Sequence, residues 1–257
     1  DLHVLVYTHR QIQALIQSAQ KQMVTKKISV HLKLETGNHR QGVELVSAYD
    51  LAQTIVQSDY LSLAGLCSHY ANIEDTSDHN YAQNQRKTFI QMYESITQHP
   101  KILPYLSYMP LKHIANSAAS ILWPQEVMDI ARIGISAYGL WPSTETKGVA
   151  QYLQKTLSLK PALSWKTKIT QIKEIAQGKS IGYGCTFTTT RESKIAVIPV
   201  GYYEGYDRGL SNLSYVLIRG QRAPVRGRVC MNMMMVEVTD IQIVCEGDEV
   251  VLLGQQG

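Results

Sequence analysis

The chain of 257 residues lacks most of the features that mark membrane-spanning or exported proteins. No apolar run approaches the roughly 18 residues that a membrane-spanning helix needs. Residues Asp1 to His3 show no basic leader followed by an apolar core, so we expect no secretory signal and a cytoplasmic protein. The net charge of +4 is small for this length and gives no reason to expect a nucleic-acid partner.

Cysteine is scarce and widely spaced. The sequence contains Cys67, Cys185, Cys230 and Cys245, with no Cys-x-x-Cys pair among them. Zinc sites and disulfide frameworks rely on closer, repeated spacings, so we expect neither a metal ion nor a disulfide. We predict four reduced thiols, as is usual in a cytoplasmic protein.

The first part of the sequence alternates between two hydrophobic periodicities. Strand-like runs and amphipathic helical patterns alternate over residues 2–7, 8–23, 28–34, 47–57, 61–67 and 80–97. Thr8 followed by Gln11 fits a capping box at the start of the first helix. Such alternation predicts a parallel sheet, either open or part of a (β/α) barrel of the TIM type.

The pattern changes after Trp141-Pro142-Ser143. Short β-rich runs, separated by Gly and Asp turns, then cover residues 162–175, 194–200, 215–219, 223–238 and 249–253. We therefore predict an α/β domain over residues 1–150 and an all-β domain over residues 151–257. A complete barrel takes about 250 residues, so we expect the first barrel strands to be missing and the chain to be truncated at both ends.

Two loops of the α/β half carry polar residues at the point where a strand ends. Arg40 lies in the glycine-containing loop 35–42, on the side of a sheet where barrel enzymes place their active sites. By pattern alone, an ordinary turn explains this loop as well. His69 follows the next strand, where it can act as a base, a metal ligand or an orienting donor, although a structural histidine is commoner.

Two later segments suit an anion. Asn116 or Ser117 caps a predicted helix whose exposed amides suit a phosphate, and an ordinary helix cap is the simpler alternative. Gly134 and Ile135 end a short run that begins at Arg132, and the glycine allows an anion to approach the backbone closely. Two such loops in succession match the phosphate sites in the last loops of many barrels.

The all-β half presents aromatic and basic groups among glycines. Tyr183 lies between two glycines, and its phenol is a competent acid or base only if its pKa is lowered from about 10. Tyr202 belongs to a run of interface or core character. We predict that the four arginines in residues 219–228 face solvent and that the methionines around Met231 pack in the core.

Taken together and in order, these motifs resemble the alanine racemase family. The matching strings span residues 31 to 254 and include His31-Leu32-Lys33-Leu34-Glu35-Thr36-Gly37 with Arg40, Ser68-His69-Tyr70-Ala71, Ala115-Asn116-Ser117-Ala118-Ala119, Arg132-Ile133-Gly134, Tyr183-Gly184, Pro199-Val200-Gly201-Tyr202 and Arg226-Gly227-Arg228-Val229-Cys230-Met231. The resemblance implies an enzyme that uses pyridoxal 5′-phosphate (PLP). It also implies a partial PLP-binding (β/α)8 TIM-type barrel followed by a C-terminal β-domain.

The resemblance assigns a cofactor site to residues of the α/β half. It implies that Arg132, braced by His69, hydrogen-bonds the pyridine nitrogen of PLP. The residues implied for the phosphate are Ser117, Asn116, Gly134 and Ile135. Arg40 is implied to contact the cofactor phenolate and the substrate carboxylate, and Lys33 matches a lysine that the family often carbamylates to position that arginine.

The resemblance assigns the substrate side to the β-domain. Tyr183 is implied to be one of two catalytic acid/bases, and Tyr202 and Met231 complete the substrate site. Racemisation removes a proton from one face of Cα and delivers one to the other, so two bases on opposite faces suit it, with PLP as the electron sink. In this family Tyr183 and Met231 reach the active site of the other subunit, which implies a homodimer.

The sequence departs from the family pattern in three places. The family lysine that carries PLP belongs to its first barrel strand, and no lysine here matches that motif. A late tyrosine that contacts the phosphate is also missing. We therefore expect these 257 residues alone not to racemise alanine. Asn38-His39 stands where many relatives have Met-Gly, which leaves the substrate preference open.

The implied function is the interconversion of L- and D-alanine for peptidoglycan synthesis in a bacterial cytoplasm. Three alternatives stay open: a serine or broad-specificity racemase, a non-catalytic PLP-binding protein, and one half of a larger fusion. The Tyr183 motif argues against a PLP carrier, because barrel-only PLP carriers lack the β-domain.

Overall fold

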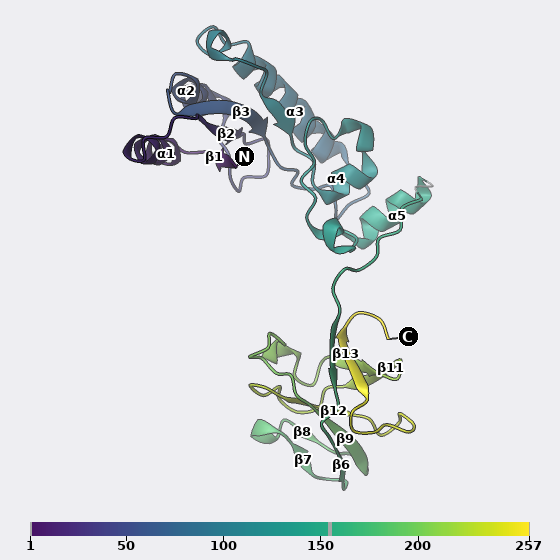
Figure 1. Ribbon diagram of the computed structural model, residues 1–257. Coiled ribbons are helices and arrows are strands. Elements are labelled where there is room, and N and C mark those ends of the chain that lie inside the picture. The colour runs from purple at the N-terminus through teal and green to yellow at the C-terminus, as the bar shows by residue number, and fades with distance from the viewer. Residues whose placement is uncertain (1, 154–155, 257) are drawn as a thin grey trace. The chain divides into compact units, whose positions relative to one another are not determined.

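The computed structural model describes residues 2–153 and 156–256 (Figure 1). Contacts within the chain divide it into two units, Asp1–Lys160 and Pro161–Gly257, and each unit has its own hydrophobic core. The boundary expected after residue 150 falls inside helix α5 (Thr144–Tyr152), whose Ala150 is buried in the first core. We propose that the two domains meet between residues 160 and 161.

The first unit alternates strands and helices along the chain. Its elements are β1 (His3–Val6), α1 (His9–Lys21), β2 (Ile28–Lys33), α2 (Leu45–Val56), β3 (Leu61–Cys67), α3 (Asn80–Thr97), η1 (Leu103–Tyr105), β4 (Leu111–His113), α4 (Ser117–Leu122), η2 (Pro124–Glu126), η3 (Ile135–Tyr138) and α5. The strands form one parallel sheet in the order β1-β2-β3-β4. None of the helices in the described residues is both long and apolar enough to cross a membrane.

Helix α1 begins where the sequence predicts a capping box. The Thr8 hydroxyl accepts a hydrogen bond from the backbone N–H of Gln11, and the Gln11 side chain accepts one from the backbone N–H of Thr8. Ile12 and Ala19, seven residues apart and therefore on one face, are buried. The capping box is confirmed.

Helices pack against one face of the sheet. Figure 1 shows α1, α2 and α3 gathered beside the strands, and α2 contacts β2, β3 and α3. Val30 and Leu32 of β2 belong to the resulting core and are fully buried. Because side chains alternate across a strand, His31 and Lys33 project from the second face of the sheet.

An irregularity in β3 decides which residues share that second face. The register pairs Val30 with Leu63 but His31 with Gly65, so Ala64 is an extra residue of the β-bulge type. The shift brings Gly65 level with His31. Without it, alternation along the strands would place Gly65 beside a residue of the other face.

The second unit is antiparallel. Its strands are β5 (Trp165–Lys168), β6 (Gln171–Ile175), β7 (Ser180–Ile181), β8 (Phe187–Thr188), β9 (Ser193–Ile198), β10 (Tyr215–Ile218), β11 (Gln221–Pro224), β12 (Met234–Glu237) and β13 (Glu249–Leu253). They form sheets of the orders β11-β10-β13-β5, β12-β9-β6 and β7-β8. The predicted fold class, a partial parallel α/β sheet followed by an all-β domain, is confirmed.

Two of the predicted β-rich runs each contain residues of two strands. The run 223–238 divides into β11 and β12, because the chain turns at Gly227 with φ of 78°. A Cβ at Gly227 would lie 2.5 Å from the Ile181 carbonyl oxygen, so glycine is required at this close approach. The run 162–175 similarly divides into β5 and β6.

Candidate active site

The residues that carry chemistry in the first unit lie at the carboxyl ends of its parallel strands. Lys33 ends β2, Cys67 ends β3 and leads into His69, and His113 ends β4. The register pairs Lys33 with Cys67 and Cys67 with His113, so the three strand ends are adjacent. Parallel α/β folds place their active sites at this edge.

Arg132 is held at this edge by a dense set of hydrogen bonds. Its Nη1 lies 2.6 Å from His113 Nδ1 and donates to the His113 carbonyl oxygen at 3.2 Å. Its Nη2 donates to the Ser68 carbonyl oxygen at 2.6 Å and lies 3.1 Å from His69 Nδ1. Both terminal nitrogens are thereby engaged, and within the described residues no acceptor contacts Nε.

These contacts set the protonation of both histidines. A guanidinium only donates hydrogen bonds, so Nδ1 of His69 and of His113 must be unprotonated acceptors. Burial, with the Arg132 charge beside it, lowers the pKa of His69 to about 4 and that of His113 to about 3. Both rings are therefore neutral near neutral pH. The predicted neighbours Arg132 and His69 are brought together.

Lys33 is a buried amine at the same edge. Its Nζ donates to Gln41 Oε1 at 3.2 Å, and Gln41 is the chain neighbour of Arg40. Burial lowers the pKa of Lys33, and the charges of Arg40 and Arg132 lower it further. Burial raises the pKa of the adjacent Cys67 thiol to about 11, so that thiol stays protonated.

The loop that carries Arg40 is fixed by a carboxylate. Glu35 Oε1 accepts hydrogen bonds from the backbone N–H groups of Gly37, at 2.6 Å, and Asn38, at 2.7 Å. These bonds lower the pKa of Glu35 against the opposing effect of its burial. His39 has φ of 52°, a conformation that glycine adopts more easily. Arg40 itself is exposed at the end of this ordered loop.

The predicted phosphate residues also come together. The Ser117 hydroxyl accepts from the backbone N–H of Gly134 at 3.0 Å and of Ser136 at 3.4 Å. Asn116 caps α4 by accepting from the Ala119 N–H at 3.0 Å. A Cβ at Gly134 would meet no atom within 4 Å, so the backbone here borders open space.

Tyr183, Tyr202 and Met231 lie in the second unit and are exposed. Tyr183 begins the short helix η4 (Tyr183–Cys185), between two glycines with positive φ. The backbone N–H of Tyr202 donates to the Cys230 carbonyl oxygen at 3.0 Å, which places Tyr202 beside Met231. Met231 is 55% exposed, which shows that the expectation of a core position is wrong for this methionine.

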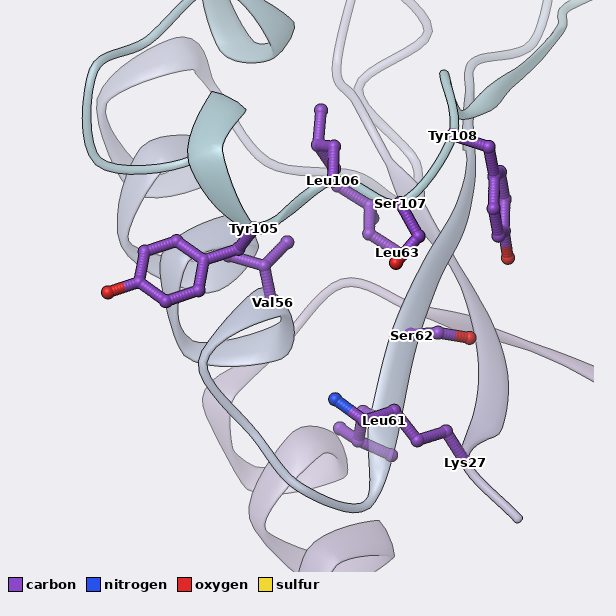
Figure 2. Close-up of a pocket in the computed structure, with 9 residues that line it drawn as sticks. All are labelled: Lys27, Val56, Leu61, Ser62, Leu63, Tyr105, Leu106, Ser107 and Tyr108. Atoms are coloured by element: carbon purple, nitrogen blue, oxygen red, sulfur yellow. The ribbon is translucent and has the colours of Figure 1, made fainter.

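A pocket of about 90 Å³ lies at the opposite, amino ends of the strands. Figure 2 shows the residues that line it. Leu61, Ser62 and Leu63 of the start of β3 line it, together with Lys27 and residues 105–108. Lys27 Nζ is already engaged by the Ser58 carbonyl oxygen at 2.7 Å. Residues at the amino ends of barrel strands serve stability more often than catalysis. We therefore place the site at the other edge.

Sequence reasoning missed the roles of His31 and His113. His31 begins one of the strings quoted for the resemblance and His113 lies two residues before another, but the resemblance assigns neither of them to the site. The alternation of His31 with Lys33 along β2 is a signal that both point the same way. Among the described residues no group of three or more His, Cys, Asp or Glu is arranged to hold a metal ion.

Comparisons with known proteins identify the family to which the chain is similar. Residues 1–142 match the family described as alanine racemase, N-terminal domain, and residues 162–257 match alanine racemase, C-terminal domain. The alanine racemase of Halothermothrix orenii is 41% identical over 239 residues, which cover 93% of this chain and 59% of that protein. The alanine racemase of Methylacidiphilum infernorum is 37% identical over 100% of this chain and 60% of its own length.

Solved structures give the same result. The alanine racemase of Bacillus anthracis with bound L-Ala-P has a TM-score of 0.84 at 28% identity, over 100% of this chain and 62% of that one. The alanine racemase of Clostridium difficile 630 also has a TM-score of 0.84, at 29% identity, over 99% of this chain and 62% of that one. The chain thus spans about three fifths of the length of these relatives. By its sequence and its fold, the chain belongs to the alanine racemase family.

Proposed function

We propose that this chain forms the PLP site and the β-domain of an amino-acid racemase that interconverts L- and D-alanine. The observation that carries the proposal is the half-buried Arg132, whose Nη1 and Nη2 are both engaged while Nε–H has no acceptor among the described residues. A donor fixed in this way suits an aromatic nitrogen that must be hydrogen-bonded but not protonated.

The residues present fit the cofactor. Arg132 would face the pyridine nitrogen, and Ser117 with the backbone of Gly134 and Ile135 would face the phosphate beside Asn116. Gly134 has room for such a group, because a Cβ there would meet nothing within 4 Å. When bound, PLP supplies an electron sink for the electrons released at the substrate Cα.

The chain's own residues supply binding and proton transfer. Arg40 binds the substrate carboxylate, while Tyr202 and Met231 shape the substrate side. Tyr183 holds or removes a proton at its phenol oxygen on one face of Cα. The second base is a lysine that no position of this sequence matches.

Lys33 suits carbamylation. Burial lowers the pKa of its amine, which raises the fraction of neutral amine able to attack carbon dioxide. The addition forms an N–C bond and releases one proton, leaving an N-carboxylate. That anion would sit beside the cations Arg40 and Arg132 and would orient Arg40.

The protein assembles as a homodimer in this proposal, with Tyr183 and Met231 reaching the partner's cofactor. It acts in a bacterial cytoplasm and provides D-alanine for peptidoglycan. Serine or broad-specificity racemisation is the second candidate. It is favoured by Asn38, whose side-chain amide donates to the Tyr70 carbonyl oxygen at 3.3 Å beside the Arg40 loop.

Cofactor binding provides the test of the site. In titrations of the protein with PLP followed by absorbance, Arg132→Lys should weaken PLP binding by about tenfold or more, because an ammonium cannot hold the guanidinium's several planar contacts. The control Arg191→Lys changes an arginine whose side chain is 51% exposed and should leave PLP binding unchanged. Equal PLP affinity for Arg132→Lys and the unsubstituted protein would contradict the proposal.

A further inference from the structure

We propose that His31 and His113 are positioning residues for Arg132, joined with His3 in a row of hydrogen-bonded rings that fixes the guanidinium so that its Nε–H stays available to a ligand. The role of Arg132 toward PLP rests on the proposed function. The row itself is a property of this chain that stands apart from it.

The row runs across the strands of the sheet, from β1 through β2 to β4. His3 Nδ1 lies 2.8 Å from His31 Nε2, and His31 Nδ1 lies 2.6 Å from His113 Nε2. His113 Nδ1 lies 2.6 Å from Arg132 Nη1. His31 and His113 are 6% and 5% exposed, so water does not compete for these nitrogens as it would at a surface.

Gly65 makes the central contact possible. His31 belongs to β2 and His113 to β4, and β3 lies between them. A Cβ at Gly65 would lie 2.3 Å from His31 Nδ1, the atom that meets His113. The absence of a side chain at this position, set level with His31 by the bulge at Ala64, is therefore what lets the two rings meet across the strand.

Every hydrogen bond of the row has the same direction, with the donor on the Arg132 side and the acceptor on the His3 side. Arg132 can only donate, so His113 Nδ1 accepts and the neutral His113 ring carries its proton on Nε2. That proton is donated to His31 Nδ1, and the His31 Nε2 proton is donated to His3 Nδ1. The direction follows from Arg132 rather than from observed hydrogens. Burial lowers the pKa of both His31 and His113, in agreement with neutral rings.

This polarity gives His31 a function beyond packing. If His113 had no acceptor for its Nε2 proton, its other tautomer would place an N–H against Arg132 Nη1, donor against donor. Holding the His113 proton on Nε2 therefore keeps an acceptor in front of Arg132. If the guanidinium rotated to turn Nε toward these acceptors, it would lose the Nη1 bond to His113 Nδ1 and the Nη2 bond to the Ser68 carbonyl oxygen.

Nitrogen NMR of the unsubstituted protein, labelled with ¹⁵N in histidine and free of cofactor, shows which ring nitrogen of each histidine in the row carries the proton. His31 and His113 should both show a protonated Nε2 and an unprotonated Nδ1 at neutral pH. A proton on Nδ1 of His113, or a doubly protonated ring at either position, would overturn the proposal. This readout does not depend on PLP binding, so it separates the row from the proposed function.

Variants then test whether the row positions Arg132. His113→Leu removes the acceptor and should weaken PLP binding by about tenfold or more, whereas His113→Asn retains an acceptor near the Nδ1 position and should recover most of that loss. Gly65→Ala should separate His31 from His113, change the His113 tautomer signals and weaken PLP binding while leaving both histidines in the sequence. Circular dichroism and thermal melting identify variants that fail to fold.

Equal PLP affinity in folded His113→Leu or Gly65→Ala and the unsubstituted protein would show that the row has only a structural role. Failure of the unsubstituted protein to bind PLP would contradict the proposed function instead. In that case the NMR result alone would decide whether the row exists.

Discussion

At the scale of single residues, the site is defined by groups kept in one protonation state. Burial lowers the pKa of Arg132, but a guanidinium stays charged near neutral pH, and the histidines stay neutral because burial and Arg132 oppose a second charge. Cys67 stays a thiol because burial disfavours its thiolate more strongly than the charges of Arg132 and Lys33 favour it. The amine of Lys33 is also shifted toward its neutral form, in which it can act as a nucleophile.

From the pKa values of the buried histidines we predict how the stability of the protein depends on pH. His113 titrates at a pKa of about 3 when folded, against about 6.5 when unfolded, so below pH 6.5 the unfolded chain takes up protons that the folded chain does not. Stability should therefore be complete above pH 6.5 and fall toward pH 3, by on the order of a few kcal/mol at pH 4, with His69 acting in the same direction.

Urea denaturation between pH 7 and pH 4 measures this dependence. The variant His113→Asn has no titrating ring at that position, so its free energy of unfolding should fall less steeply over the same range. A slope identical to that of the unsubstituted protein would contradict the assignment of a neutral, buried His113.

At the scale of elements, the sequence predicted the order of strands and helices better than the contacts between their side chains. The Thr8–Gln11 capping box, the alternation of strands and helices and the cap at Asn116 follow from local patterns and are confirmed. The row of histidines could not be predicted, because it depends on one extra residue in β3. A register shift of one residue changes which side chains share a face, and no local sequence pattern indicates where such a shift occurs.

The split of the run 223–238 has a related cause. Glycine at 227 marks a turn, but the alternating residues on both sides read as one strand. The required approach of Gly227 to the Ile181 carbonyl is a tertiary contact between segments far apart in the sequence. The assigned roles of the site residues remain predictions, since their placement alone does not test them.

At the scale of elements we also predict that replacing Gly201 by alanine destabilises the protein. A Cβ there would lie 2.2 Å from the Cys230 carbonyl oxygen and 2.5 Å from the Met231 carbonyl oxygen, so Gly201→Ala must displace the segment that holds Met231. We expect a loss of about 2 kcal/mol or more in the free energy of unfolding.

The matched control is Gly148→Ala in helix α5, where a Cβ would meet nothing within 4 Å. This substitution should be neutral or stabilise the protein by up to about 1 kcal/mol, because alanine favours the helix more than glycine does. Thermal or urea unfolding measures both variants. Equal stability of Gly201→Ala and the unsubstituted protein would contradict the close approach.

At the scale of the whole molecule, the proposed active site is built from two copies of the chain. The residues proposed to bind PLP lie in the first unit and Tyr183 lies in the second, and in the proposed homodimer Tyr183 serves the partner's cofactor. A racemase assembled from two different inactive subunits should therefore regain activity. One subunit carries Tyr183→Phe and the other carries Arg132→Ala, which leaves one intact site in each mixed dimer.

The mixture, after dissociation and reassociation, should recover up to about a quarter of the unsubstituted activity, because half of the dimers are mixed and each holds one intact site of two. Reassociated samples of either variant alone are the controls. No recovery in the mixture, with mixed dimers demonstrated by mass spectrometry, would show that Tyr183 serves its own subunit.

The central claim is amino-acid racemisation with Tyr183 as one of two bases. The most direct measurement is the rate of D-alanine formation from L-alanine, followed by chiral chromatography, for the protein that contains this chain, with PLP added and with Tyr183→Phe as the comparison. The account predicts turnover in the unsubstituted protein and a loss of about a hundredfold or more in Tyr183→Phe, with PLP still bound. Saturating PLP binding without turnover of L-alanine or L-serine, or equal turnover in Tyr183→Phe, would contradict it.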